Sequence, residues 1–94
     1  MKFTKLQKEK IEAFRVANEE KIYNFVSIDW RWTPSKNKSC IIVWQRKNQP
    51  KHMRSEMILF SMEPGKTFEN KMKLCVELIG CKKIPTKSKW SIYR

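Results

Sequence analysis

Apolar side chains recur at helical spacing in the first part of the chain, from Phe3 to Tyr23, and no Gly or Pro interrupts them. Thr4 followed by Gln7 has the spacing of a capping box, in which the two side chains bind free backbone N–H groups at a helix start. The outer positions mix acids and bases, which is typical of a solvated face. We therefore predict an N-terminal helix that ends at or before Tyr23.

Strand-like patterns follow this helix. Segment 25–32 alternates between faces, so that Trp30 and Trp32 lie on the same side of it. Segment 40–45 is almost continuously apolar, as expected of a central strand that is covered on both faces. Segment 53–62 has an apolar centre, and short polar turns separate the three segments. We predict an antiparallel meander of three strands, in which Trp30 belongs to the core.

A second helix is predicted from 68 to 79, where apolar side chains return to helical spacing. Thr67 is placed to cap its start, and Gly80 to end it in the left-handed conformation. Two interpretations of residues 81–94 stay open. The aromatic side chains at 90–93 fit a short final edge strand, and the basic composition fits a flexible tail.

These elements predict one small α+β domain over residues 1–94. Its architecture is an N-terminal helix, a three-stranded antiparallel meander and a second helix. A short C-terminal strand is added under the first interpretation of the last residues. Both helices are expected to pack on one side of the sheet, because each helix has one apolar face to bury.

The order of these elements is similar to the core topology of double-stranded-RNA-binding domains. Those domains carry a Gly-Pro-His-type loop between the first two strands and a Lys-Lys-x-x-Lys-type run at the start of the second helix. Here residues 33–36 read Thr-Pro-Ser-Lys, and residues 66–71 read Lys-Thr-Phe-Glu-Asn-Lys with separated lysines. The resemblance lies in the topology and not in those motifs, so it implies a fold rather than a function.

The charge of the chain points to a class of partner. There are 21 Lys and Arg against 9 Asp and Glu, which gives a formal net charge of +12. Repulsion among so many cations destabilises a compact state, so an anionic partner is the favoured explanation of the composition. A basic surface that only maintains solubility is the simpler alternative.

Basic and aromatic residues concentrate in the stretch 30–54, which holds three of the four tryptophans and no Asp or Glu. Cations bind phosphate groups and aromatic rings stack on bases, so we predict non-catalytic binding of nucleic acid, either DNA or RNA. Trp32 and Trp44 are the predicted stacking platforms. Consecutive hairpin turns normally lie at opposite ends of a sheet, which would spread the charge as a stripe suited to a long polyanion. The candidate nucleic-acid-binding residues are Arg31, Trp32, Lys36, Lys38, Trp44, Arg46, Lys47, Lys51 and Arg54.

Several kinds of chemistry are disfavoured by what the sequence lacks. A chain with two glycines has no Gly-rich phosphate loop. Metal-dependent nucleases need clustered carboxylates, and Asp29 is the only Asp. Cys40, His52, Cys75 and Cys81 have no recognised zinc-binding spacing. We therefore expect no cofactor and no bound metal, and we do not expect an enzyme.

Two alternatives to plain nucleic-acid binding stay open. Small ribonuclease toxins of the RelE-like class are similar in size, basic character and helix-plus-sheet content, and they cleave RNA without a metal. In that interpretation His52, Glu56, Lys51, Arg54 and Tyr93 act as acid, base and phosphate-binding groups. The other alternative is a small phage-type inhibitor, which binds an acidic protein surface or a ribonucleoprotein of a host defence or nucleic-acid-processing system through Trp and Arg anchors.

The composition also predicts a compartment. Three cysteines without a CxxC pair, and a lysine-rich start without a secretory signal, favour a reducing cytoplasmic location, which is the host cytoplasm if a phage encodes the chain. Lysine far outnumbers arginine, which is typical of AT-rich genomes such as those of phages and mobile elements. No apolar segment reaches the roughly 20 residues that cross a bilayer. The sequence does not determine an oligomeric state.

Overall fold

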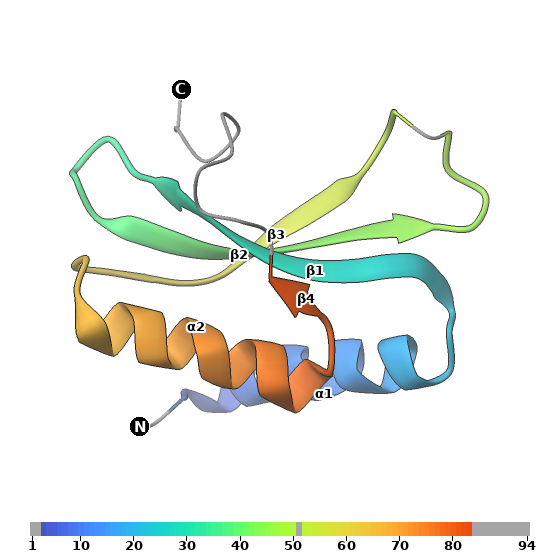
Figure 1. The fold of residues 1–94 in the computed structure, drawn as a ribbon, viewed down its shortest axis with the longest axis horizontal. Helices are drawn as coiled ribbons and strands as arrows, with labels where there is room; N and C mark the ends of the chain where they lie inside the picture. The colour runs from blue at the N-terminus through green and yellow to red at the C-terminus, as the bar shows by residue number, and fades with distance from the viewer. Residues whose placement is uncertain (1–2, 51, 84–94) are drawn as a thin grey trace.

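The computed structural model describes residues 3–50 and 52–83, and it confirms the predicted α+β meander with a helix on either side of it in the sequence. Figure 1 shows that both helices cover the same side of the sheet. The short final strand considered for residues 90–93 lies outside the described residues. The elements in chain order are α1 (Lys5–Glu19), β1 (Tyr23–Trp32), β2 (Lys38–Arg46), β3 (Ser55–Met62), α2 (Lys66–Ile79) and β4 (Lys82–Lys83).

The sheet has the strand order β3-β2-β1-β4, with β2 antiparallel to both of its neighbours. The continuously apolar second strand is therefore central, as predicted. The two-residue strand β4 runs parallel to β1 and pairs with Ser27 and Ile28. The β1–β2 and β2–β3 loops lie at opposite ends of the sheet (Figure 1), which confirms the arrangement expected of consecutive hairpins.

The core fills the space between the sheet and the two helices. Ile28 of β1 and Ile42 of β2 are fully buried, and Phe68 and Met72 of α2 pack into the same cluster. Trp30 is 8% exposed and belongs to this cluster, as predicted. Burial of one such side chain stabilises the fold by about 1.5–3 kcal/mol, so these facing residues fix how the helices lie on the sheet.

Helix α1 begins with the predicted capping box, in which the backbone N–H of Gln7 donates to Thr4 Oγ1 and the Thr4 N–H donates to Gln7 Oε1. The helix ends at Glu19, earlier than the predicted limit. Lys21 adopts a left-handed conformation with φ 55°, and the Ile22 N–H donates back to the carbonyl of Ala17. This is the hydrogen-bond pattern of a Schellman motif, whose left-handed position is usually Gly.

Helix α2 begins at Lys66, two residues before the predicted start at residue 68. Its N-cap is Gly65, which offers no side-chain hydrogen bond, so Thr67 lies inside the first turn and the predicted Thr67 cap is wrong. A glycine suits this position because its φ of 149° is one that other residues rarely adopt. The predicted left-handed end at Gly80 is confirmed, with φ 75°.

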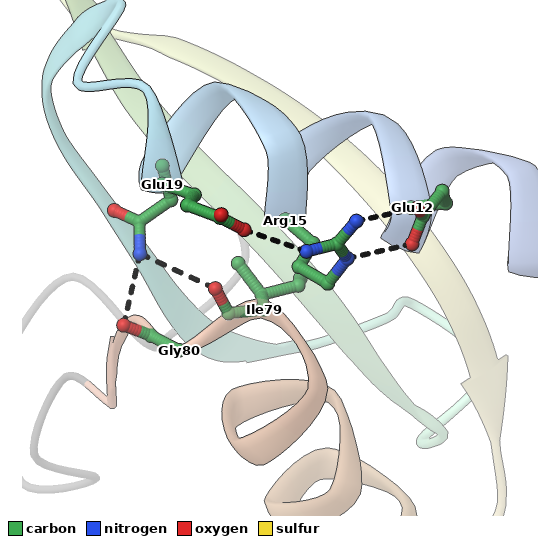
Figure 2. A network of polar contacts seen from close by, with 6 residues as sticks. Glu12, Arg15, Glu19, Ile79 and Gly80 are labelled. Carbon is green, nitrogen blue, oxygen red and sulfur yellow. Dashed lines mark hydrogen bonds and ion pairs between the residues drawn. The ribbon is translucent and has the colours of Figure 1, made fainter.

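The two helices are joined at the C-terminal end of α2. The side-chain amide of Asn18 donates to the carbonyls of Ile79 and Gly80, at 3.2 and 2.9 Å (Figure 2). Both acceptors are helix-end carbonyls that lack a partner within the helix, so α1 supplies the missing donors. On the outer side of α1, Arg15 binds Glu12 and Glu19 in the solvated charge pattern predicted for that face.

A β-bulge in β3 sets which side chains face each side of the sheet. Cys40 pairs with Phe60 and Ile41 pairs with Ile58, so Leu59 is an extra residue in β3. Leu59 and Phe60 are both buried in the core, whereas Ile58 is 53% exposed. Without the extra residue, the side chains on one side of this point would exchange faces of the sheet.

Candidate functional site

A pocket of about 360 Å³ lies on the face of the sheet that points away from the helices, at the end where the β1–β2 loop joins the strands. Its volume falls near the lower end of the about 300–1,000 Å³ usual for small-ligand sites. We call it the loop-end pocket. It is lined by Arg31, Trp32, Thr33, Pro34, Ser39, Ile41, Glu56, Met57, Ile58 and Ser61.

The pocket lies at the β-bulge. Ser39 pairs with Ser61 on one side of the bulge and Ile41 pairs with Ile58 on the other, and all four side chains line the pocket. The two serine hydroxyl groups lie 2.7 Å apart and form a hydrogen bond. Bulges bend and twist a strand and are common beside functional sites, so the same distortion that completes the core also shapes this face.

One wall of the pocket is an ion pair across the strands. The guanidinium of Arg31 binds both carboxylate oxygens of Glu56, and this partner raises the pKa of Arg31 further above its ordinary value. The remaining donor, Arg31 Nε, is buried and has no hydrogen-bond partner within the described part of the chain. Glu56 therefore compensates the charge of Arg31, but one of the guanidinium N–H donors makes no hydrogen bond within the described part of the chain.

Among the tryptophans in the described part of the chain, Trp32 is the most exposed, at 37%. Its ring meets Trp30 edge to face, with centroids 5.5 Å apart and an interplanar angle of 86°. Because Trp30 is in the core, this contact anchors Trp32, which is also one of the residues that line the loop-end pocket. The position fits the predicted stacking platform.

The loop beside Trp32 is held by its own hydrogen bonds. Thr33 and Asn37 close it through a backbone bond of 2.9 Å, and the Asn37 N–H also donates to Thr33 Oγ1. Within it Lys36 has φ 66°, a left-handed conformation that costs a non-glycine residue roughly 1–2 kcal/mol. The loop therefore holds the backbone of Lys36 in a defined conformation, and its side chain is exposed.

Lys38 is placed differently from the other candidate cations. Its Nζ lies 3.3 Å from a carboxylate oxygen of Glu69 and 4.1 Å from the centroid of the Trp30 ring. The side chain thus joins the end of β2 to α2 and covers the core aromatic group. Because the Lys38 ammonium group already interacts with Glu69 and the Trp30 ring, Lys38 is less suited to contact phosphate than an exposed lysine is.

The remaining candidates gather at the opposite end of the sheet, around the β2–β3 loop. Arg46 and Lys47 are exposed there, and the guanidinium of Arg54 lies 5.3 Å from the centroid of the Phe25 ring. Lys51 is outside the described residues. Apart from Lys38, the described basic candidates therefore lie in two groups. The first is Arg31 at the loop-end pocket with Lys36 in the adjacent loop, and the second is Arg46, Lys47 and Arg54.

Trp44 does not lie with either group. It faces the helices and packs on Phe14 of α1, with ring centroids 4.8 Å apart, and on Tyr23, with centroids 6.1 Å apart. Its indole Nε1 is buried and has no hydrogen-bond partner among residues 3–50 and 52–83. Because the Trp44 ring packs against Phe14 and Tyr23 within the fold, Trp32 is the better candidate for stacking on a base.

The side chains considered for ribonuclease chemistry are not gathered around one point. His52 is exposed in the β2–β3 loop, and Glu56 binds Arg31 at the pocket. Lys51 and Tyr93 fall outside the described residues. The ribonuclease alternative therefore gains no geometric support from the described groups.

The cysteines are placed by packing. Cys40 and Cys75 are fully buried between β2 and α2, and the contact with Cys75 together with burial raises the pKa of Cys40. Burial raises the pKa of Cys81 to about 11. No group of three or more His, Cys, Asp or Glu side chains that could hold a metal ion occurs in the described ranges. Neither helix there is long and apolar enough to span a membrane.

Sequence reasoning missed the residues that complete the pocket. Ser39, Ile58 and Ser61 carry no motif, and they come together only through the pairing of β2 with the bulged strand β3. Glu56 was considered as an acid or base, whereas the structure pairs it with Arg31. The one available signal was the proximity of Trp32 to the basic loop in the sequence.

No protein-family model matches this chain, and no characterised protein or solved structure matches it significantly.

Proposed function

We propose that this protein binds nucleic acid without catalysing a reaction, and that the loop-end pocket with Lys36 is the principal contact. The observation that carries the proposal is the placement of Trp32, an anchored and partly exposed tryptophan that lines a pocket beside a loop with an exposed lysine. Phosphate groups attract the cation, and a base has an aromatic surface to stack on. The net charge of +12 supports the same class of partner.

The second basic group supports a long ligand. Strand β2 runs between the two groups and has 9 residues, so it spans roughly 30 Å at about 3.3 Å per residue. A small anion reaches one group only, whereas a nucleic-acid chain has phosphates spaced along its length and can reach both. Arg46, Lys47 and Arg54 are then additional phosphate contacts that strengthen binding without selecting a sequence.

Electrophoretic mobility shift with labelled DNA and RNA, each at low and at moderate salt, tests this proposal. We expect a shift at low salt that weakens steeply as salt increases, because each phosphate contact releases bound counterions. Absence of a shift for both polymers at low salt would contradict the proposal. A stable complex with a host protein that survives nuclease treatment would favour the inhibitor alternative instead.

A further inference from the structure

The two basic groups by themselves do not distinguish paired from unpaired strands. We infer that the loop-end pocket takes one unpaired base, so that the preferred ligand is single-stranded nucleic acid. This inference rests on the proposed nucleic-acid binding and adds the class of strand to it.

The shape of the pocket favours a flat ligand with an apolar face. Trp32 and Pro34 bound it at the loop end, and Ile41 and Ile58 line it on the strands. A nucleobase has two flat faces that stack on such surfaces, and stacking on an aromatic side chain contributes about 1–3 kcal/mol per base. The volume of about 360 Å³ admits a ligand of that size.

Polar side chains form part of the pocket lining beside these apolar ones. Arg31 and Glu56 line the pocket as an ion pair, in which the carboxylate oxygens of Glu56 accept from the guanidinium. The hydroxyl groups of Ser39 and Ser61 can each act as donor or acceptor. The edge of a base carries both donors and acceptors, so this mixture suits a base better than it suits a phosphate, which only accepts.

A base within a duplex cannot use these groups. Its faces are stacked on neighbouring bases and its pairing edge is bound to the opposite strand, so it enters a pocket only after it leaves the stack. Leaving the stack costs a few kcal/mol in a duplex and much less in a single strand. The pocket therefore selects unpaired strands, while the basic groups contact the backbone of either form.

Fluorescence anisotropy tests the inference with three labelled ligands of equal length, about 10 nucleotides each. They are a mixed-sequence single strand, the duplex of that strand, and an abasic strand that keeps the phosphates and lacks the bases. At one fixed salt concentration we expect the single strand to bind at least about tenfold more tightly than the abasic strand, and more tightly than the duplex.

Substitutions locate the effect at the pocket. Trp32→Ala should weaken single-strand binding about tenfold and leave abasic-strand binding unchanged, whereas Trp32→Phe should retain most of the affinity. Ser61→Leu, at an exposed position, narrows the pocket without changing charge and should weaken single-strand binding in the same selective way. Leu78→Ala removes an exposed apolar side chain from α2 and serves as the control that changes neither affinity.

Equal binding of the single and abasic strands, tighter binding of the duplex, or loss of affinity for all three ligands alike in Trp32→Ala would overturn the inference. In each of these cases nucleic-acid binding itself stands, because the polymers still bind. Failure of every ligand to bind at low salt would remove the proposed function together with the inference. Thermal melting of each variant confirms that it is folded before its affinity is compared.

Discussion

Replacement of Trp44 by Ala is expected to lower the free energy of unfolding by about 3 kcal/mol or more. Trp44 packs on Phe14 of α1 and on Tyr23 at the start of β1, so truncation leaves a cavity where the first helix meets the sheet. A loss of this size in a domain of under 100 residues corresponds to a fall in Tm of more than about 10 °C. Thermal unfolding followed by circular dichroism measures it.

Two further substitutions make this result specific. Trp44→Phe keeps an aromatic ring and removes the buried indole N–H that has no partner in the described chain, so it should cost much less than Trp44→Ala. Trp32→Ala removes a partly exposed ring that contacts Trp30 edge to face, and it should cost about 1 kcal/mol. Equal losses for Trp44→Ala and Trp32→Ala would contradict the separate roles assigned to the two tryptophans.

Replacement of Lys36 by Gly is expected to change stability and binding in opposite directions. The residue has φ 66°, which glycine adopts without strain, so the variant should gain about 1 kcal/mol in the free energy of unfolding. It also loses the cation beside the loop-end pocket. Its affinity for an oligonucleotide at low salt should fall about threefold to tenfold, and the slope of log affinity against log salt should decrease by about one unit.

Lys21→Gly is the matched control for this variant. Lys21 also has a left-handed backbone, with φ 55°, and the same unit of charge is removed. It lies in the α1–β1 turn, away from the loop-end pocket, so stability should increase while affinity stays within about twofold. If both variants lose affinity equally, general charge rather than a contact at Lys36 governs binding, and the assigned site is wrong.

Local chemistry made the elements predictable. Thr4 and Gln7 specify the start of α1 through neighbouring backbone groups, and Gly80 is where a left-handed helix end needs a glycine. The central position of β2 follows from its apolar run, because a strand with one wet face would alternate. Each of these signals acts over a few residues, so the sequence displays it directly.

The pocket could not be predicted from any short segment of the sequence, because its residues come together through strand pairing. Ile58, Leu59 and Phe60 are all apolar, and the bulge that exposes Ile58 and buries the other two is a property of the β2–β3 pairing. The partnership of Arg31 with Glu56 depends on the same pairing. A shift of one residue moves a side chain to the other face of a sheet, so composition alone could not assemble this site.

Tertiary packing also decided between the two candidate stacking residues. Trp32 and Trp44 both lie near strand ends in basic surroundings, and the sequence ranks them alike. They differ because α1 crosses the sheet where Phe14 reaches Trp44, whereas Trp32 lies at the other end of the sheet, where its ring contacts Trp30 and its centroid lies 5.4 Å from Lys38 Nζ. Helix crossing over a sheet is set by the whole core and is not encoded near either tryptophan.

The most direct test of nucleic-acid binding at the loop-end pocket is a titration of the ¹⁵N-labelled protein with a single-stranded oligonucleotide, followed by two-dimensional NMR. We expect the Trp32 indole N–H signal and the backbone amide signals of Trp32, Thr33, Ser35 and Lys36 to shift progressively and saturate, while the Trp44 indole signal stays nearly fixed. Absence of any shift at high oligonucleotide concentration, or shifts centred on α1 and α2 with residues 32–36 unaffected, would contradict it.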